Sequence, residues 1–188
     1  MKKKRILIPG LLFLAALLLP GCAKSAPQPH AHTWENRKCV TCGEEKEVHR
    51  LGNWEYVLWE ETGTMEMVSF PENAEEVPFR ELPEGISSVQ VADGITAIPD
   101  DAFWGCETLV DVTLPRTVRT IGKGAFGQCV NLARINIPEG VTSIGGDAFF
   151  LCRSLTRLTI PDSVTSIEGN PFQYMSAEIQ VSPENPAF

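Results

Sequence analysis

The chain has 188 residues, of which 43% are hydrophobic and 21% are charged, and its formal net charge at pH 7 is −8. That length allows a sizeable core together with a small additional module. The acidic balance argues against nucleic acid and anionic lipid surfaces as partners, because both repel a negatively charged protein.

Residues 1–21 have the organisation of an export signal. Basic residues at positions 2–5 precede an apolar stretch over residues 6–19, which is too short to span a membrane comfortably. The stretch ends in LPGC, which resembles the lipobox of bacterial lipoproteins. That resemblance implies transfer of a diacylglyceryl group to the sulfur of Cys22 and cleavage after Gly21. We expect an extracytoplasmic, lipid-anchored protein at the bacterial cell surface; a non-lipidated secretory signal or an uncleaved anchor is the alternative.

Residues 22–29 form a short polar tether, and a cluster of metal-ligand residue types follows within residues 30–48. The candidate ligands are His30, His32, Cys39 and Cys42. Imidazole and thiolate are the groups that zinc prefers, and four of them close a structural site. The segment resembles the H-x-W…C-x-x-C-G ribbon modules of bacterial surface proteins. It lacks one cysteine that those modules usually carry, so either His30 or His49 would complete the set.

A disulfide is the other interpretation of this cysteine pair. Outside the cytoplasm Cys39 and Cys42 could join to each other and leave the two nearby histidines in solvent. A thioredoxin-like role is disfavoured, because no strand–helix–strand pattern surrounds the C-x-x-C motif. Structural zinc and a small disulfide therefore both remain open at this point.

Residues 49–85 are predicted to form a β-hairpin and a connector. Residues 54–59 alternate in the manner of a strand, Gly63 lies in a turn, and residues 65–70 form the returning strand. The acidic residues of the connector, residues 71–83, are interpreted as solvated surface. Such a hairpin would cap the first turn of a repeat structure, which otherwise exposes its core.

Residues 86–188 contain a repeat of 23 residues. Its four complete copies, followed by a partial one, are residues 86–108, 109–131, 132–154 and 155–177. Each copy has apolar residues at positions one, four, six, ten and thirteen, followed by a phenylalanine. A fixed period of this length is typical of solenoids, in which stacked copies bury a continuous core. We therefore expect a mainly β solenoid whose bends are short helical or 3-10 turns, as in residues 147–152.

A cysteine column runs through the first three copies. Cys106, Cys129 and Cys152 occupy one repeat position, and Met175 replaces them in the fourth copy. A metal or redox site would need the three sulfurs to converge on one point. Replacement by methionine instead favours small apolar side chains stacked one per turn.

The pattern L-x-x-I-x-I-P-x-x-V-x-x-I-G-x-x-A-F-x-x-C, clearest in residues 132–152, resembles the BspA-like leucine-rich repeat. The resemblance implies a curved right-handed solenoid with the hairpin as its N-terminal cap. It also implies a secreted or surface protein that acts in adhesion or host-protein binding. Departures at Pro99, Glu168 and Pro171 fall in the first and last copies and are interpreted as capping. The tail over residues 179–188 resembles a variant repeat that normally continues further.

In a leucine-rich repeat the outward residues beside the strands line a continuous face. The candidate ligand-face residues are Asp111, Thr113, Arg134, Asn136, Arg157 and Thr159. Arg134 and Arg157 occupy equivalent positions, and an arginine pair can hold a carboxylate or a sulfate of a partner. The alternative is that these side chains only keep the surface soluble.

Motifs of catalysis are missing from the sequence. It contains no glycine-rich phosphate loop and no nucleophile elbow, and all three histidines precede the repeats. We therefore expect no enzyme but a monomeric binding module with a protein or glycan partner at the cell surface. An architectural component of the cell envelope is the alternative.

Overall fold

The computed structural model describes residues 34–35, 38–39, 45–51, 54–60, 62–70, 82–183 and 185–187. The chain divides into two compact units, Met1–Gly43 and Glu44–Phe188, which we describe separately. The predicted signal segment, the tether and most of the acidic connector lie outside the described residues. So do four predicted site residues: Cys22, His30, His32 and Cys42.

The first unit contains one described hairpin. Strand β1 (Trp34–Glu35) pairs antiparallel with β2 (Lys38–Cys39), with Trp34 opposite Cys39. The backbone of Cys39 is therefore part of a strand, while its side chain is not described.

The second unit begins with three antiparallel strands, β3 (His49–Leu51), β4 (Trp54–Trp59) and β5 (Thr64–Ser69). The predicted hairpin is β4 and β5, and Gly63 adopts a φ of 65° in the turn between them, a conformation that glycine reaches at little cost. The second edge of β5 pairs in parallel with the first repeat strand, with Met65 opposite Val89. Strand β5 is thus both the returning strand of the cap and the first strand of the solenoid.

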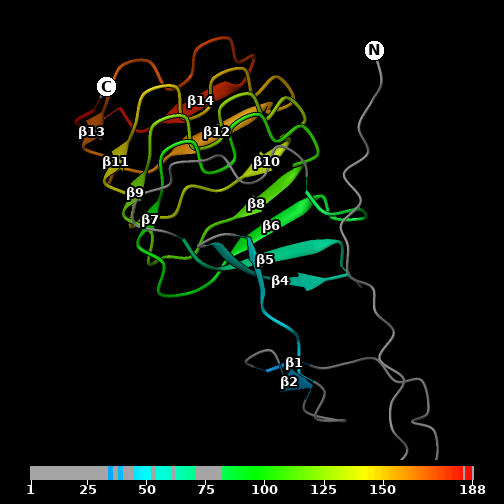
Figure 1. Cartoon of the computed structure of the whole chain (residues 1–188). Coiled ribbons are helices and arrows are strands. Elements are labelled where there is room, and N and C mark those ends of the chain that lie inside the picture. Colours follow the sequence, from blue (N-terminus) through cyan, green and yellow to red (C-terminus); the bar gives the residue numbers. More distant parts are fainter. Residues whose placement is uncertain are drawn as a thin grey trace, which may run out of the picture. The chain divides into compact units, whose positions relative to one another are not determined.

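One face of the solenoid, which we call the strand face, continues from β5. It consists of β6 (Ser88–Val91), β8 (Asp111–Thr113) and β10 (Arg134–Ile135), all parallel, and then a separate parallel pair, β12 (Arg157–Ile160) and β14 (Glu178–Val181). Side chains alternate along these strands: Val89, Val112 and Leu158 are 1% exposed, and the residues between them face outward. Figure 1 shows the strands stacked one per turn from cap to C-terminus.

The second face is a narrow sheet of two-residue strands, here called the back face. Its members are β7 (Ala97–Ile98), β9 (Thr120–Ile121), β11 (Ser143–Ile144) and β13 (Ser166–Ile167). All are parallel, and each pairs with the next at the same repeat position (Figure 1). The ladder on this face is therefore continuous over all four copies.

The core lies between the two faces and contains the predicted phenylalanine ladder. The rings of Phe103, Phe126, Phe149 and Phe172 stack in sequence, with centroids 5.6, 5.7 and 6.1 Å apart. Phe103, Phe126 and Phe149 are fully buried. Phe70 of the cap meets Phe103 edge-on at 6.3 Å, so the same stack joins the cap to the repeats. The predicted solenoid fold is confirmed.

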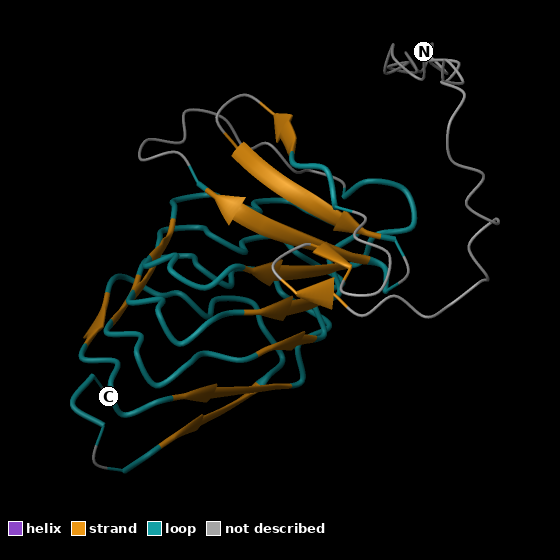
Figure 2. Cartoon of the chain, turned by 90° about the horizontal axis from the view of Figure 1, so that it is seen from below, coloured by secondary structure: helices purple, strands orange, loops and turns teal. Residues whose placement is uncertain are grey.

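The bends after the back face are tight turns, and they are not helical. In residues 147–152 the amide of Phe150 bonds the carbonyl of Asp147, but the amide of Phe149 bonds Pro171 of the next copy. Asp147 and Leu151 have φ of 58°, which a right-handed helix does not allow. Alternate amides therefore join neighbouring copies, and a helix would have used all of them locally. Figure 2 shows only strands and loops in the described part of the chain.

Membrane-spanning helices were also sought. In the described ranges no helix reaches the length and apolar character that crossing a membrane requires.

The partial fifth copy closes onto the fourth. Strand β14 pairs with β12 over four residues, and Asn185, only 3% exposed, donates a hydrogen bond from Nδ2 to the carbonyl of Pro161 (2.9 Å). The amide of Ala187 donates to Oδ1 of the same asparagine. The Asn-Pro motif of the tail thus satisfies a strand-end carbonyl of the preceding turn.

Candidate functional site

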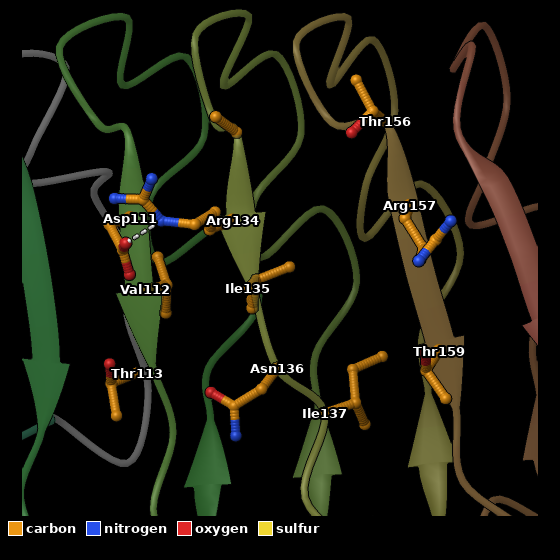
Figure 3. Close-up of a pocket in the computed structure, with 11 residues that line it drawn as sticks. Asp111, Val112, Thr113, Arg134, Ile135, Asn136, Ile137, Thr156, Arg157 and Thr159 are labelled. Atoms are coloured by element: carbon orange, nitrogen blue, oxygen red, sulfur yellow. Dashed lines mark hydrogen bonds and ion pairs between the residues drawn. The ribbon is translucent and has the colours of Figure 1, made fainter.

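The six predicted ligand-face residues lie along one groove of about 470 Å³. Strand β8 contributes Asp111 and Thr113, the β10 segment contributes Arg134 and Asn136, and β12 contributes Arg157 and Thr159. Figure 3 shows these side chains around the hollow, with Asp111 and Arg134 on one side and Arg157 on the other. The structure therefore brings all six residues to one place on the strand face.

A break in the strand ladder forms this groove. Strands β8 and β10 pair at two positions, and β12 and β14 pair at four. No pair joins β10 to β12, although every residue of both strands is described. The copies to which they belong remain joined on the back face, where β11 pairs with β13. The third and fourth copies thus stay stacked behind and separate in front.

The floor of the groove is apolar. Ile135 is half-buried, whereas the equivalent residues Val112 and Leu158 are 1% exposed. Ile137, at 8% exposed, also lines the groove. The break therefore uncovers part of the core between two polar walls.

The two arginines flank the groove, and each has its own acidic partner. Nε of Arg134 lies 2.6 Å from Oδ2 of Asp111, and Nη2 of Arg157 lies 3.7 Å from Oε2 of Glu178. The side chains of Arg157 and Glu178 are both 66% exposed. Exposed ion pairs contribute little to stability, so a ligand carboxylate could compete for either guanidinium.

Two residues at this site are missing from the sequence-based prediction. Thr156 lines the groove, and Glu178 binds Arg157. Glu178 pairs with Arg157 across β12 and β14 at an offset of 21 residues, whereas the complete copies are offset by 23. Extrapolating the repeat into the tail with its own register would have found this partner.

The predicted metal ligands are described only in part. Cys39 lies in β2, and His49, the alternative ligand, stacks on Tyr56 with ring centroids 5.4 Å apart. Within residues 45–187, so far as they are described, no group of three or more potential ligands comes together. The zinc site therefore stays a prediction about the first unit.

The cysteine column is a packing feature, as predicted. Cys106, Cys129 and Cys152 are fully buried free thiols. The thiol of Cys129 donates to the carbonyl of Phe103 (3.0 Å), and that of Cys152 donates to the carbonyl of Phe126 (3.2 Å). Burial raises the pKa of all three thiols, that of Cys152 to about 12. Thiols of this kind are unreactive and serve the stacking of the copies.

A second hollow, of about 570 Å³, lies on the back face. The backbone at Gly122 and Gly145 lines it, together with Asp100 and Lys123. The carboxylate of Asp100 already accepts a hydrogen bond from the backbone amide of Lys123 (2.7 Å). This hollow leaves the ladder closed, so the strand-face groove is the stronger candidate.

Comparison with known proteins gives one family match. The model of the BspA type leucine rich repeat region matches residues 59–185 in six copies. The match begins before the four copies read from the sequence, in agreement with the role of β5 as a repeat strand. No curated protein matches the chain.

Two solved structures have a related fold. A leucine rich cell surface protein from Faecalibacterium prausnitzii is 28% identical, with a TM-score of 0.51, and the match covers 73% of this chain and 40% of that one. A leucine-rich repeat protein from Eubacterium ventriosum is 27% identical, with a TM-score of 0.53, and the match covers 72% and 43%. The matched region thus spans less than half the length of either structure.

Proposed function

The chain belongs to the BspA-type leucine-rich repeat family, and from that premise we propose that it is a lipid-anchored surface protein that binds another protein through its strand face. The similar protein from F. prausnitzii is described as a cell surface protein, which supports an extracytoplasmic location. The proposed role is non-enzymatic, because repeats of this kind present surfaces.

One observation carries the binding role: the groove between β10 and β12. It combines an apolar floor with charged walls, whereas the neighbouring β6 and β8 are paired along their length. Binding sites commonly place a few polar groups around apolar surface in this way. The strand face is therefore the surface on which a partner is sought.

Charge reversal tests this role. The purified chain and its Arg134→Glu/Arg157→Glu variant are immobilised and exposed to extracellular proteins, and the captured proteins are quantified by mass spectrometry. We expect a protein that the wild type retains and the variant loses. Arg116→Glu/Arg153→Glu is the control, because both residues are exposed and neither lines the groove. Equal capture by all three proteins would contradict binding through the strand face.

Lipid anchoring at Cys22 is supported by the basic, apolar and LPGC segments of the sequence. More than one acyl chain holds a protein firmly on a membrane, at about 0.8 kcal/mol per buried CH₂. Cells that express the wild type should incorporate labelled palmitate into the chain, and Cys22→Ala should abolish the label. Cys42→Ala, which leaves the LPGC segment intact, should keep it. An unlabelled wild type would refute the anchor.

Exposure on the cell separates this role from an architectural one. A binding protein displayed outward is degraded when protease is added to intact cells. An envelope component with no external ligand is degraded only after lysis. Quantifying the chain by immunoblot under both conditions decides between them, and protection in intact cells would contradict the proposed role.

Structural zinc in the first unit is the second part of the proposal. Its support is the set of two histidines and two cysteines, and the pairing of Trp34 with Cys39 in the hairpin. Elemental analysis should find about one zinc per chain after dialysis, and Cys39→Ser should lose it. His30→Gln and His49→Gln identify the fourth ligand, because only one of them should release the metal. Sub-stoichiometric zinc in the wild type would refute the site.

A further inference from the structure

We propose that the groove between β10 and β12 accepts an extended acidic segment of a partner protein as an added β-strand, with a carboxylate of that segment bound by Arg157. The proposal rests on the function proposed above and specifies how the strand face binds.

The pairing pattern shows which backbone groups face the groove. In parallel strands, successive residues direct their amide and carbonyl groups to opposite neighbours. The amide of Arg134 bonds the carbonyl of Val110, so Arg134 faces β8 and Ile135 faces the groove. The carbonyl of Thr156 accepts the amide of Glu178, so Thr156 faces β14. Arg157 and Thr159, which alternate with it, therefore face the groove from the other side.

Two strand edges thus border one hollow. A strand edge with unpaired amides and carbonyls is a template for another strand, and peptide-binding proteins use such edges by adding a strand from the partner. The break lies between the third and fourth copies, where the back face stays closed. The copies can therefore hold the edges in place while a segment enters from the front.

The charges at the groove favour an acidic segment. Arg134 is occupied by Asp111 at 2.6 Å, which also neutralises the one carboxylate that lines the groove. Arg157 keeps only a 3.7 Å contact with Glu178, and both side chains are largely exposed. The chain as a whole carries a formal charge of −8, so a locally basic groove stands out on it. A carboxylate that bonds the guanidinium closely would displace Glu178.

The apolar floor determines what alternates with the acidic residues. Side chains of a strand point alternately to its two faces. In an added strand, one set would point inward to Ile135 and Ile137, and the other set would point outward beside Arg157. The partner segment therefore alternates apolar and acidic residues, and this pattern is the chemistry by which it can be recognised.

Short acetylated and amidated peptides test the proposal with the full-length chain. The probes alternate glutamate with valine or with threonine, and matched peptides carry lysine in place of glutamate. Fluorescence anisotropy measures affinity, and amide NMR locates the site. The glutamate peptides should bind and shift the amide signals of Ile135, Arg157 and Thr159, while the lysine peptides should not bind.

Two sets of variants separate strand pairing from simple charge attraction. N-methylation of alternate peptide residues removes the donors of one strand edge and leaves the side chains unchanged, and it should weaken binding by about tenfold or more. Arg157→Gln should weaken binding by about tenfold, because it removes a charge-assisted hydrogen bond. Arg153→Gln, the matched control outside the groove, should change it by less than about twofold.

Three results would overturn the proposal. They are no binding of any glutamate peptide up to about 1 mM, equal binding of the lysine peptides, or affinity that N-methylation leaves unchanged. If Arg134→Glu/Arg157→Glu still abolishes capture of a protein partner in such a case, the strand face binds by another mode and only the added strand is refuted. If capture is also unchanged, the proposed function fails as well.

Discussion

The two faces of this solenoid are built from the same copies, yet only one of them is continuous. On the back face, β7, β9, β11 and β13 pair without interruption. On the strand face, pairing stops after β10 and resumes between β12 and β14. Because the copies have equal length, the difference arises from residues that vary between copies.

Close approach is what the back face requires. A Cβ atom built on Gly145 would lie 2.5 Å from the amide nitrogen of Lys123, and one on Gly122 would lie 2.6 Å from that of Asp100. Glycine at these positions therefore allows the copies to stack. Glu168 replaces glycine in the fourth copy, where the neighbouring residue of the third copy is Gly146.

Like charges distinguish the strand face. Arg134 and Arg157 occupy equivalent positions on adjacent copies, and like charges directly opposite each other destabilise a strand pair. Each guanidinium turns to an acid on the far side of the groove, Asp111 or Glu178. The break coincides with this arginine pair, and we infer that the repulsion contributes to it.

Loss of the shared core should have the largest effect. Phe126 is fully buried between Phe103 and Phe149, so Phe126→Ala should lower the free energy of unfolding by about 3–5 kcal/mol. Thermal and urea unfolding measure it. Phe172→Ala at the end of the stack, where the ring is only partly buried, should cost less. Equal melting of Phe126→Ala and the wild type would show that the stack does not hold the two faces together.

A methyl group on the back face should have the next largest effect. Gly145→Ala would place Cβ against the backbone of the second copy and should cost about 1–3 kcal/mol. Gly146→Ala is the matched control, because its Cβ would meet its nearest atom, the carbonyl oxygen of Glu168, at 3.3 Å. Equal melting temperatures for the two variants would contradict close stacking of this face.

Alkaline pH should destabilise the core through the cysteine column. Burial raises the pKa of Cys152 from 9.0 to about 12, so the folded state holds this proton more tightly than the unfolded state. Its contribution is complete below pH 9.0 and is lost as pH rises toward 12, at up to about 1.4 kcal/mol per pH unit. Urea unfolding above pH 9.0 should show a shallower pH dependence for Cys152→Ala than for the wild type. Identical slopes would mean that the thiol is already ionised in the folded protein.

Removing a groove arginine should have the smallest effect on stability. The ion pair of Arg157 with Glu178 is exposed, so Arg157→Gln should change the free energy of unfolding by less than about 1 kcal/mol. Urea unfolding beside Arg153→Gln provides the comparison. A large loss of stability would show that Arg157 has a structural role in place of the proposed binding role.

The repeat pattern was sufficient to predict the solenoid, the phenylalanine stack and the packed cysteines, because each depends on residues that recur at one position. It also selected the six residues of the groove, since outward positions follow from strand alternation. The role of β5 was missed because Met65 lies 24 residues before Val89 and its pattern differs from that of the later copies. Glu178 was missed because the last copy is shorter. The break could not be predicted, because it depends on contacts between neighbouring copies.

Amide hydrogen exchange tests the central claim, that the same two copies are joined behind and separate in front. On the back face, the amides of Ser166 and Glu168 bond the third copy and should be protected. On the strand face, the amides of Arg157 and Thr159 should exchange at least roughly tenfold faster, because no strand of the third copy pairs with them. Equal protection of all four amides would show a continuous ladder on both faces and would contradict the account.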